Sequence, residues 1–101
     1  MDMEYTISIG LNDKDSHRQE ISTEDAYQIV FDAFPDCTVK EYRGSFTHSD
    51  GVRVIERSFQ VVVYADSSEK PRLVETCRML KIALNQEAIF LSSRRISSEM
   101  I

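Results

Sequence analysis

Apolar and polar positions alternate strictly at the start of the chain. Apolar side chains occupy every second position from Met3 to Leu11, and polar residues or glycine lie between them. This period of two predicts a strand with one buried face. The polar stretch that follows, residues 12–21, is typical of a loop.

The next segment has the period of a helix. Ser22 is suited to cap the first turn, and Asp25 stands at the third helical position. The apolar residues behind it recur at intervals of three and four, which places them on one stripe that faces a core. They are Ala26, Ile29, Val30, Ala33 and Phe34. Pro35 ends the predicted helix, because proline disfavours helical geometry in the residue before it.

Residues 37–65 form two alternating segments around His48-Ser49-Asp50-Gly51. Asp-Gly favours a two-residue hairpin turn, in which both central residues adopt positive φ. With Asp50-Gly51 as that turn, the numbers of opposed residues add up to 101. Tyr42 is then expected to face Phe59, and Phe46 to face Ile55, on a core side shared with Val61 and Val63.

The other side of this hairpin is expected to be polar near its tip and apolar near its base. The polar positions are Glu41, Arg43, Ser45, Glu56, Ser58 and Gln60. The apolar positions are Cys37, Val39, Val62 and Tyr64. An error of one residue in the turn would shift every one of these pairings.

A second helix is predicted after the hairpin. Residues 66–68 offer caps, Pro71 is tolerated in the first turn, and Asn85 marks the end. The predicted buried stripe comprises Leu73, Val74, Cys77, Leu80, Ala83 and Leu84. The apolar run 88–91 is of strand type, and residues 92–101 fit either a short further strand or a tail.

The predicted order is therefore β-α-β-β-α-β within one domain, residues 1–101. Right-handed crossovers around a central hairpin give an α+β ferredoxin-like sandwich, a four-stranded antiparallel sheet with two helices on one face. The opposite sheet face is then left open. An open, partly apolar face meets a second subunit or a partner, or forms the floor of a pocket. We expect a homodimer through this face or through an edge strand.

Composition narrows the range of functions. The 101 residues carry 17 acidic and 12 basic side chains, a net charge of −5, which argues against direct nucleic-acid binding. The longest apolar run, residues 61–65, is far shorter than the ~20 residues of a membrane helix. No charged-then-apolar leader opens the chain, so we expect a cytoplasmic protein. Cys37 and Cys77 are expected to be reduced thiols.

No motif for a metal, a cofactor or a catalytic nucleophile stands out. Asp13, Asp15 and His17 alternate, but a hard cation needs more oxygen ligands, and zinc needs a tighter set of nitrogen and sulfur. A solvated loop explains them better. Neither cysteine has a histidine near it in sequence, and three glycines do not build a phosphate loop. We therefore predict no cofactor and favour a protein that is not an enzyme.

The polar half of the open face carries the candidate binding residues. Arg43 is expected to lie diagonal to Glu56, with Ser58 beside them. Either these charges form a solvated lattice of ion pairs, or they line a pocket that a second subunit closes, in which Glu56 acts as acid or base. Arginine suits carboxylate and phosphate, so Arg57, Arg94 and Arg95 are candidates for an anionic ligand or an acidic partner.

The order of several short motifs resembles a known family. Gly10-Leu11 closes the first strand, Phe34-Pro35-Asp36 precedes the second, Glu56-Arg57-Ser58 lies in the third, and Asn85-Gln86-Glu87-Ala88 enters the fourth. Together they resemble small uncharacterised bacterial and phage proteins of ferredoxin-like fold with an N-Q-E-[SA] signature. Cys37 departs from the glycine expected after Phe-Pro-Asp. The resemblance implies a fold and no activity, and it directs attention to Glu56, Gln86 and Glu87.

Two functions follow from these observations. The favoured one is a small acidic, dimeric interaction protein that binds a protein partner through its open sheet face, for example a phage or mobile-element inhibitor of host machinery. The alternative is a small-molecule-binding protein or an enzyme, whose pocket at a dimer interface holds an anionic metabolite or a nucleotide.

Overall fold

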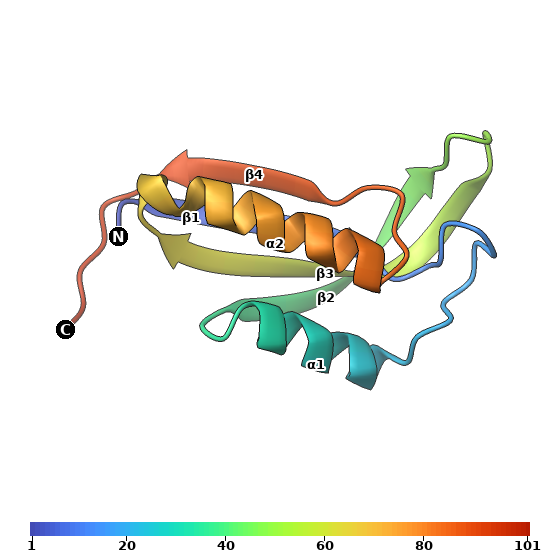
Figure 1. Ribbon diagram of the computed structural model, residues 1–101, viewed down its shortest axis with the longest axis horizontal. Helices are drawn as coiled ribbons and strands as arrows, with labels where there is room; N and C mark the ends of the chain where they lie inside the picture. Colours follow the sequence, from blue (N-terminus) through green and yellow to red (C-terminus); the bar gives the residue numbers. More distant parts are fainter.

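The fold is an antiparallel sheet with two helices on one face (Figure 1). The computed structural model describes all residues, 1–101. The elements are β1 (Met3–Gly10), α1 (Thr23–Ala33), β2 (Thr38–Thr47), β3 (Arg53–Ala65), a 3-10 turn (Ser67–Glu69), α2 (Lys70–Ala83) and β4 (Phe90–Arg95). The strand order is β2-β3-β1-β4, and all neighbours are antiparallel. The predicted α+β ferredoxin-like class is confirmed.

The core lies between the sheet and the helices. Alternate residues of β1 and of the β1-paired half of β3 point toward the helices, and the apolar stripes of α1 and α2 cover them. Tyr5, Ile7, Ile9, Phe59 and Val61 are completely inaccessible to solvent. The period-two and helical patterns of the sequence therefore meet in one apolar cluster.

Helix α1 begins, and both helices end, where local chemistry predicts, whereas α2 begins only at Lys70, after the 3-10 turn, and receives no side-chain cap from residues 66–68. Ser22 Oγ accepts a hydrogen bond of 3.1 Å from the Asp25 backbone N–H, as the capping pattern indicates. Pro71 lies in the first turn of α2, where its missing N–H costs no helical hydrogen bond. Asn85 has a φ of 46° directly after the last turn, a conformation that asparagine tolerates and that ends the helix.

The predicted register of the β2–β3 hairpin is wrong by one residue. Tyr42 pairs with Ser58 instead of Phe59, and Phe46 pairs with Val54 instead of Ile55. The turn is longer than two residues, because the His48 N–H donates to Val52 O and only Gly51 has a positive φ, 88°. The Asp50 carboxylate accepts from the Val52 N–H and stabilises this wider loop.

This shift exchanges the two faces of β2. Tyr42 and Phe46 lie on the open face, opposite Ser58 and Val54, although the sequence placed them in the core. Glu41 and Arg43, which pair with Phe59 and Arg57, lie on the helix side, whereas Ser45 still borders the open face. Cys37 and Val39, predicted to be on the open face, pack against the core. Because side chains alternate along a strand, one extra turn residue is sufficient to cause all of these changes.

The fourth strand starts later than predicted. It spans Phe90–Arg95, so the segment that the sequence left open contributes four residues to the sheet, and residues 96–101 lie outside it.

Both cysteines are free, Cys77 buried and Cys37 half-buried, and burial raises the pKa of each thiol. Neither helix combines the length and apolar character that crossing a membrane would require.

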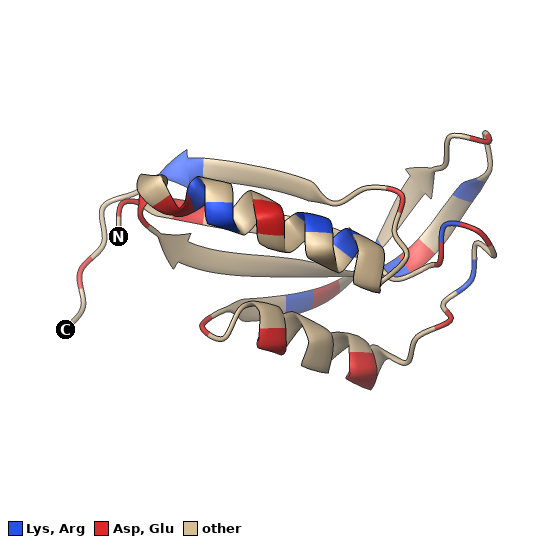
Figure 2. Cartoon of the chain, in the orientation of Figure 1, with Lys and Arg blue, Asp and Glu red and all other residues tan.

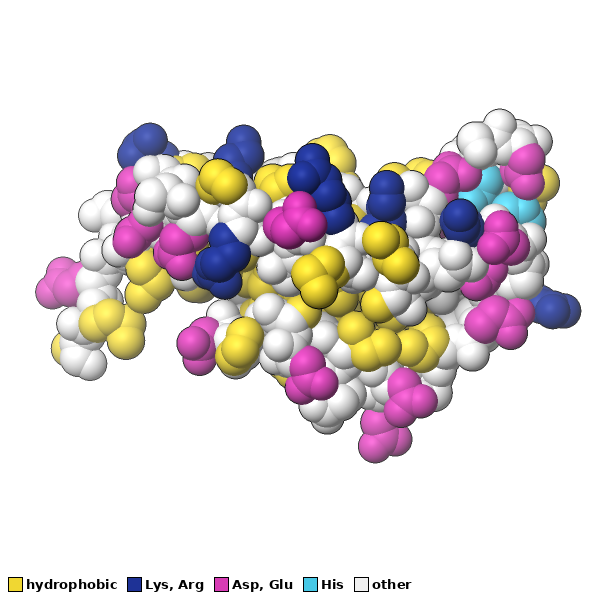
Figure 3. All heavy atoms as spheres, in the orientation of Figure 1, with side chains coloured by type: hydrophobic (Ala, Val, Ile, Leu, Met, Phe, Trp, Pro, Cys, Tyr) yellow, Lys and Arg dark blue, Asp and Glu magenta, His cyan; other side chains and the backbone are white.

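The helical side of the molecule has an uneven distribution of charge. Acidic positions occupy α1 and mostly basic positions occupy α2 (Figure 2). The space-filling view from the same side shows apolar side chains gathered between the two helices (Figure 3).

Candidate functional site

A buried carboxylate, Glu56, lies on the open face of the sheet. Its side chain projects from β3 away from the helices, and the residue is only 8% exposed. The backbone N–H of Asn12 donates a hydrogen bond of 2.8 Å to Oε2. Burial raises the pKa of Glu56 because it penalises the charged form, whereas the Asn12 N–H and the nearby His48 act in the opposite direction. The shifted pKa and concave setting make Glu56 a candidate functional group.

Two glycines on the neighbouring strands make room for this carboxylate. A Cβ at Gly10 of β1 would overlap Glu56 Oε1, so the glycine permits the carboxylate to lie against the strand. Gly44 of β2 is the direct cross-strand partner of Glu56. A Cβ there would lie 3.2 Å from the Tyr42 ring. Both positions therefore leave the open face hollow around Glu56.

This hollow is a cavity of about 390 Å³. It is lined by Ser8, Gly10, Tyr42, Gly44, Ser45, Phe46, Glu56, Ser58, Ala88, Ile89 and Phe90. Its walls combine three aromatic rings with one carboxylate and several hydroxyls. Aromatic faces stack on planar rings and attract cations, and a carboxylate accepts hydrogen bonds or pairs with a positive charge. The arrangement suits a ligand that carries a planar ring and a positive charge.

Polar contacts among three loops close one end of the sheet. His17 Nε2 lies 2.9 Å from Asp50 Oδ2, and so joins the loop after β1 to the hairpin turn. The His17 and His48 rings are 4.3 Å apart, and His48 also meets the Phe46 ring edge-on at 5.0 Å. His48 is 5% exposed; its Nδ1 lies 3.6 Å from Glu87 Oε1 on the loop before β4, too far for a hydrogen bond, and its Nε2 has no hydrogen-bond partner. The His17–His48 pair therefore packs behind the Phe46 ring of the cavity wall, without lining the cavity itself.

Gln86 and Glu87 have structural contacts next to this wall. Gln86 Nε2 donates to Asn12 O at 2.8 Å, and thus supports the residue whose N–H holds Glu56. The Glu87 carboxylate accepts from Ser49 N–H and from Ser49 Oγ, which lowers the pKa of Glu87. The resemblance directed attention to both residues, and both lie near the cavity without lining it.

The predicted diagonal between Arg43 and Glu56 is wrong. Arg43 pairs with Arg57, so both arginines project to the side opposite Glu56. Arg57 donates to Thr23 Oγ1 at 2.8 Å and lies 3.9 Å from Glu41 Oε1. The reason is the one-residue shift in register, which moves odd-numbered positions of β2 to the helix side. Ser58 does lie beside Glu56 in the cavity lining.

Arg94 and Arg95 lie at the other end of the sheet. Arg94 pairs with Glu4, and Arg95 Nη1 lies 3.1 Å from Asp2 Oδ2. They stand opposite Glu4 and Met3 of β1, whereas the cavity begins at Ser8. The structure therefore brings Glu56 and Ser58 together and keeps all four candidate arginines out of the cavity.

Several lining residues were missed from the sequence. Tyr42 and Phe46 were assigned to the core, Gly10 entered only as the end of the first strand, and Gly44 and Phe90 carried no functional signal. Only the loop length between β2 and β3 would have revealed the two aromatic residues. The hydrogen bond from the His48 N–H to Val52 O sets that length, and no sequence motif predicts it.

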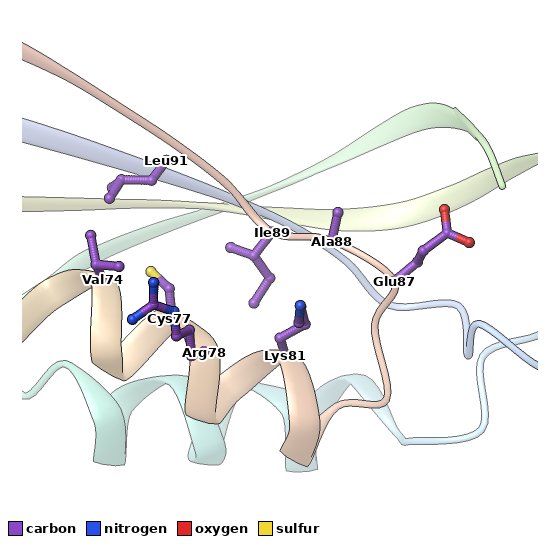
Figure 4. Close-up of a pocket in the computed structure, with 8 residues that line it drawn as sticks. All are labelled: Val74, Cys77, Arg78, Lys81, Glu87, Ala88, Ile89 and Leu91. Atoms are coloured by element: carbon purple, nitrogen blue, oxygen red, sulfur yellow. The ribbon is translucent and has the colours of Figure 1, made fainter. Parts of the chain in front are cut away.

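A second cavity lies between α2 and β4 (Figure 4). It has a volume of about 270 Å³ and an apolar floor that includes Val74, Cys77, Ile89 and Leu91. Its charged lining residues are Arg78, Lys81 and Glu87. No buried polar group faces this cavity, since the Glu87 carboxylate is held by Ser49. The open-face cavity is therefore the better candidate site.

Solved structures with a similar fold include two of one phage enzyme. A phage SAM lyase in complex with S-methyl-5′-thioadenosine superposes with a TM-score of 0.78 at 19% identity, over 93% of this chain and 81% of that chain. The apo state of a phage SAM lyase gives 0.69 at 21% identity, over 93% and 80%.

A DUF3240 family protein from Shewanella baltica OS155 gives a TM-score of 0.56 at 8% identity, over 100% of this chain and 97% of that chain. No protein-family model and no curated protein matches the sequence. At these identities the likeness establishes the fold alone. The DUF3240 protein, a member of an uncharacterised family, shares this fold. The N-Q-E-[SA] resemblance stays a prediction.

Proposed function

We propose that the open-face cavity binds S-adenosylmethionine and cleaves it to methylthioadenosine, so that the protein is a lyase. The observation that carries the proposal is the buried Glu56 carboxylate among the rings of Tyr42, Phe46 and Phe90. The fold shared with a phage SAM lyase supports it. This proposal is a version of the alternative function that the sequence suggested, a small-molecule-binding protein or an enzyme. The ligand proposed here carries a sulfonium cation, whereas the sequence suggested an anionic metabolite or a nucleotide.

The chemistry of the substrate fits the cavity. S-adenosylmethionine carries a flat adenine ring, which stacks on aromatic side chains, and a positive sulfonium, which a carboxylate and aromatic faces attract. Release of methylthioadenosine breaks the bond between sulfur and the four-carbon side, and sulfur keeps the electron pair. A lyase adds no water, so the carbon that leaves sulfur gains its new bond within the four-carbon fragment. It does so either by ring closure with the carboxylate of that fragment or by loss of a proton from the neighbouring carbon.

Glu56 has a defined role in this proposal. Its carboxylate holds the cationic part of the substrate, and the Asn12 N–H fixes one of its oxygens in place. Only the ionised form attracts a cation, and burial raises the pKa of this group. Substrate affinity therefore increases as the pH rises through the pKa of Glu56.

The test is incubation of the purified protein with S-adenosylmethionine and chromatographic measurement of methylthioadenosine. We expect product from the wild type and a loss of at least about tenfold in Glu56→Gln, which removes the charge but keeps the shape. Glu41→Gln is the matched control, because Glu41 is a carboxylate on the helix side of the hairpin. No product above the spontaneous rate, and no binding of methylthioadenosine by calorimetry, would rule the proposal out.

Protein binding through the same face is the second candidate function. Phe90 is 67% exposed and Tyr64 is 50% exposed on this side, which is typical of a surface that a partner covers. An inhibitor of phage or mobile-element origin would act this way without turnover. Cross-linking from position 64 in cell lysate identifies such a partner. A Phe90→Asp variant that captures it equally well would contradict this function.

A further inference from the structure

The two helices carry opposite charge. α1 has three acidic residues, Glu24, Asp25 and Asp32, and no basic residue. None of the three forms a salt bridge within the chain. α2 has four basic residues and a single acidic one. The helical side is thus half acidic and half basic (Figure 2).

An apolar groove separates these two halves. It has a volume of about 420 Å³, and its lining includes Ile29 and Ala33 of α1 and Met79 and Leu80 of α2. Met79 is 66% exposed, and Ile82, one turn further along, is 79% exposed. Apolar side chains gather there in the space-filling view (Figure 3). Large apolar side chains in the centre of a face with charged margins are typical of an interaction surface.

We infer that a second copy of this chain docks on this helical face. A two-fold axis along the groove places each α1 on the partner's α2, so acidic margins meet basic margins and the apolar centre meets itself. This self-complementary pattern is what a two-fold interface requires. It leaves the open sheet face and its cavity accessible, and it differs from the homodimer through the sheet that the sequence suggested.

The spacing of the charges matches this arrangement. α1 and α2 run in opposite directions, so the start of α1 lies beside the end of α2 (Figure 1). The two-fold axis keeps this order, so acidic α1 faces the partner's basic α2. Asp32 lines the groove at the level of Thr76, and it therefore comes to lie between the partner's Arg72 and the partner's Arg78. Asp25 and Asp32 are about 10.5 Å apart along their helix, and Arg72 and Arg78 about 9 Å, from the rise per residue. Asp32 therefore has a guanidinium within about one helical turn on either side of its level.

Both arginines retain donors for a second carboxylate. Arg72 Nη2 holds Glu69 at 2.8 Å, and Arg78 Nη1 holds Glu75 at 3.3 Å. A guanidinium has five N–H donors in a fork, so one exposed intrachain bond leaves the others available. Their side chains are 64% and 68% exposed.

The first experiment measures the oligomeric state by sedimentation equilibrium. We expect a concentration-dependent dimer for the wild type. For the double variant Met79→Glu with Ile82→Glu we expect a dimer dissociation constant at least about tenfold larger. Both side chains are exposed, so the fold is retained, and circular dichroism checks this. Tyr64→Glu is the matched control on the open sheet face. A monomeric wild type, or a dimer that only Tyr64→Glu dissociates, overturns the inference.

The second experiment tests the pairing of the helices. Asp25→Arg with Asp32→Arg makes both helices basic, and Arg72→Asp with Arg78→Asp makes both acidic. Each variant alone is expected to lose self-association by about tenfold or more, because like charges then face each other. An equimolar mixture is expected to form a heterodimer, since each acidic helix then meets a basic one. Separate variants that dimerise normally, or a mixture that stays monomeric, contradict the α1-to-α2 pairing.

Discussion

At the scale of single residues, the open sheet face depends on how one carboxylate is held. Glu56 is buried, yet it has one backbone donor and lies against a strand position without a side chain. Burial of an ionisable group costs free energy, and the hydrogen bond from Asn12 offsets a part of it. A group that folding keeps at this cost is a better functional candidate than the exposed arginine pairs, which contribute little.

A Gly10→Ala variant tests how the carboxylate is held. The added Cβ overlaps Glu56 Oε1, and the flexible end of the glutamate side chain moves away rather than the backbone. We therefore expect a loss of only about 1 kcal/mol in unfolding free energy, the value of one hydrogen bond. Binding of S-adenosylmethionine is expected to fall much more strongly, because the displaced carboxylate no longer faces the positive charge of the sulfonium. Urea unfolding and calorimetry measure the two effects, and unchanged binding would contradict this account of Gly10.

The pH dependence of stability gives a second test of Glu56. Burial raises its pKa above the ordinary value of 4.5, so the folded state binds this proton more tightly than the unfolded state. The wild type therefore loses stability as the pH rises from 4.5 through the folded pKa, and the loss stays constant above it. Glu56→Gln lacks this loss. Its stability relative to the wild type should rise across that window in urea titrations, and a constant difference would argue against a raised pKa.

At the scale of elements, the β2–β3 hairpin decides which side chains reach the site. Its loop between Thr47 and Arg53 is longer than a two-residue turn, and this sets the register of two long strands. The register in turn places Tyr42 and Phe46 over the cavity and Arg43 on the helix side. A small feature of the backbone thus selects the chemistry of a whole sheet face.

A Gly51→Ala variant tests this loop. Gly51 has a φ of 88°, and no atom lies within 4 Å of a Cβ built there, so the only cost is backbone strain. We expect a loss of about 1–2 kcal/mol in unfolding free energy. Gly51→Asn should lose clearly less, because asparagine tolerates positive φ. Equal losses in the two variants would indicate a cause other than the backbone angle.

At the scale of the whole molecule, one apolar core separates two faces with different properties. The open sheet face carries a polar and aromatic cavity, and the helical face carries an apolar groove with charged margins. A ligand on the first and a second copy on the second do not compete for the same surface. The charges behind the net value of −5 are also unevenly distributed, since α1 is acidic and α2 is mostly basic.

A Phe59→Ala variant tests how strongly both faces depend on the core. Phe59 is completely buried, and its ring lies 4.4 Å from the Tyr27 ring of α1. We expect a loss of about 3–5 kcal/mol in unfolding free energy, a large part of the stability of a small domain. Phe46→Ala is the comparison, since this ring lies on the open face. Similar losses in thermal and urea unfolding would mean that the core is not where the structure places it.

The sequence by itself determined the elements and the fold class. The alternation in β1, the stripes of α1 and α2, the Ser22 cap and the proline positions act locally, so they are legible without tertiary contacts. The faces of β3 were also predicted correctly, from Glu56 and Ser58 to Phe59 and Val61. Ile55, expected on the core side, is instead 62% exposed, because the hairpin tip extends beyond the helices (Figure 1). The correctly predicted properties depend on residue type and spacing alone.

Only the tertiary structure decided the composition of the site. The β2 register depends on a loop in which Asp50, His48 and Val52 bond to one another, and no dipeptide signal encodes that geometry. The contact of Gly10 with Glu56, and the bond from Asn12, join residues more than 40 positions apart. Such contacts exist only once the strands have paired, because strand pairing is what brings distant backbone and side-chain atoms to one face.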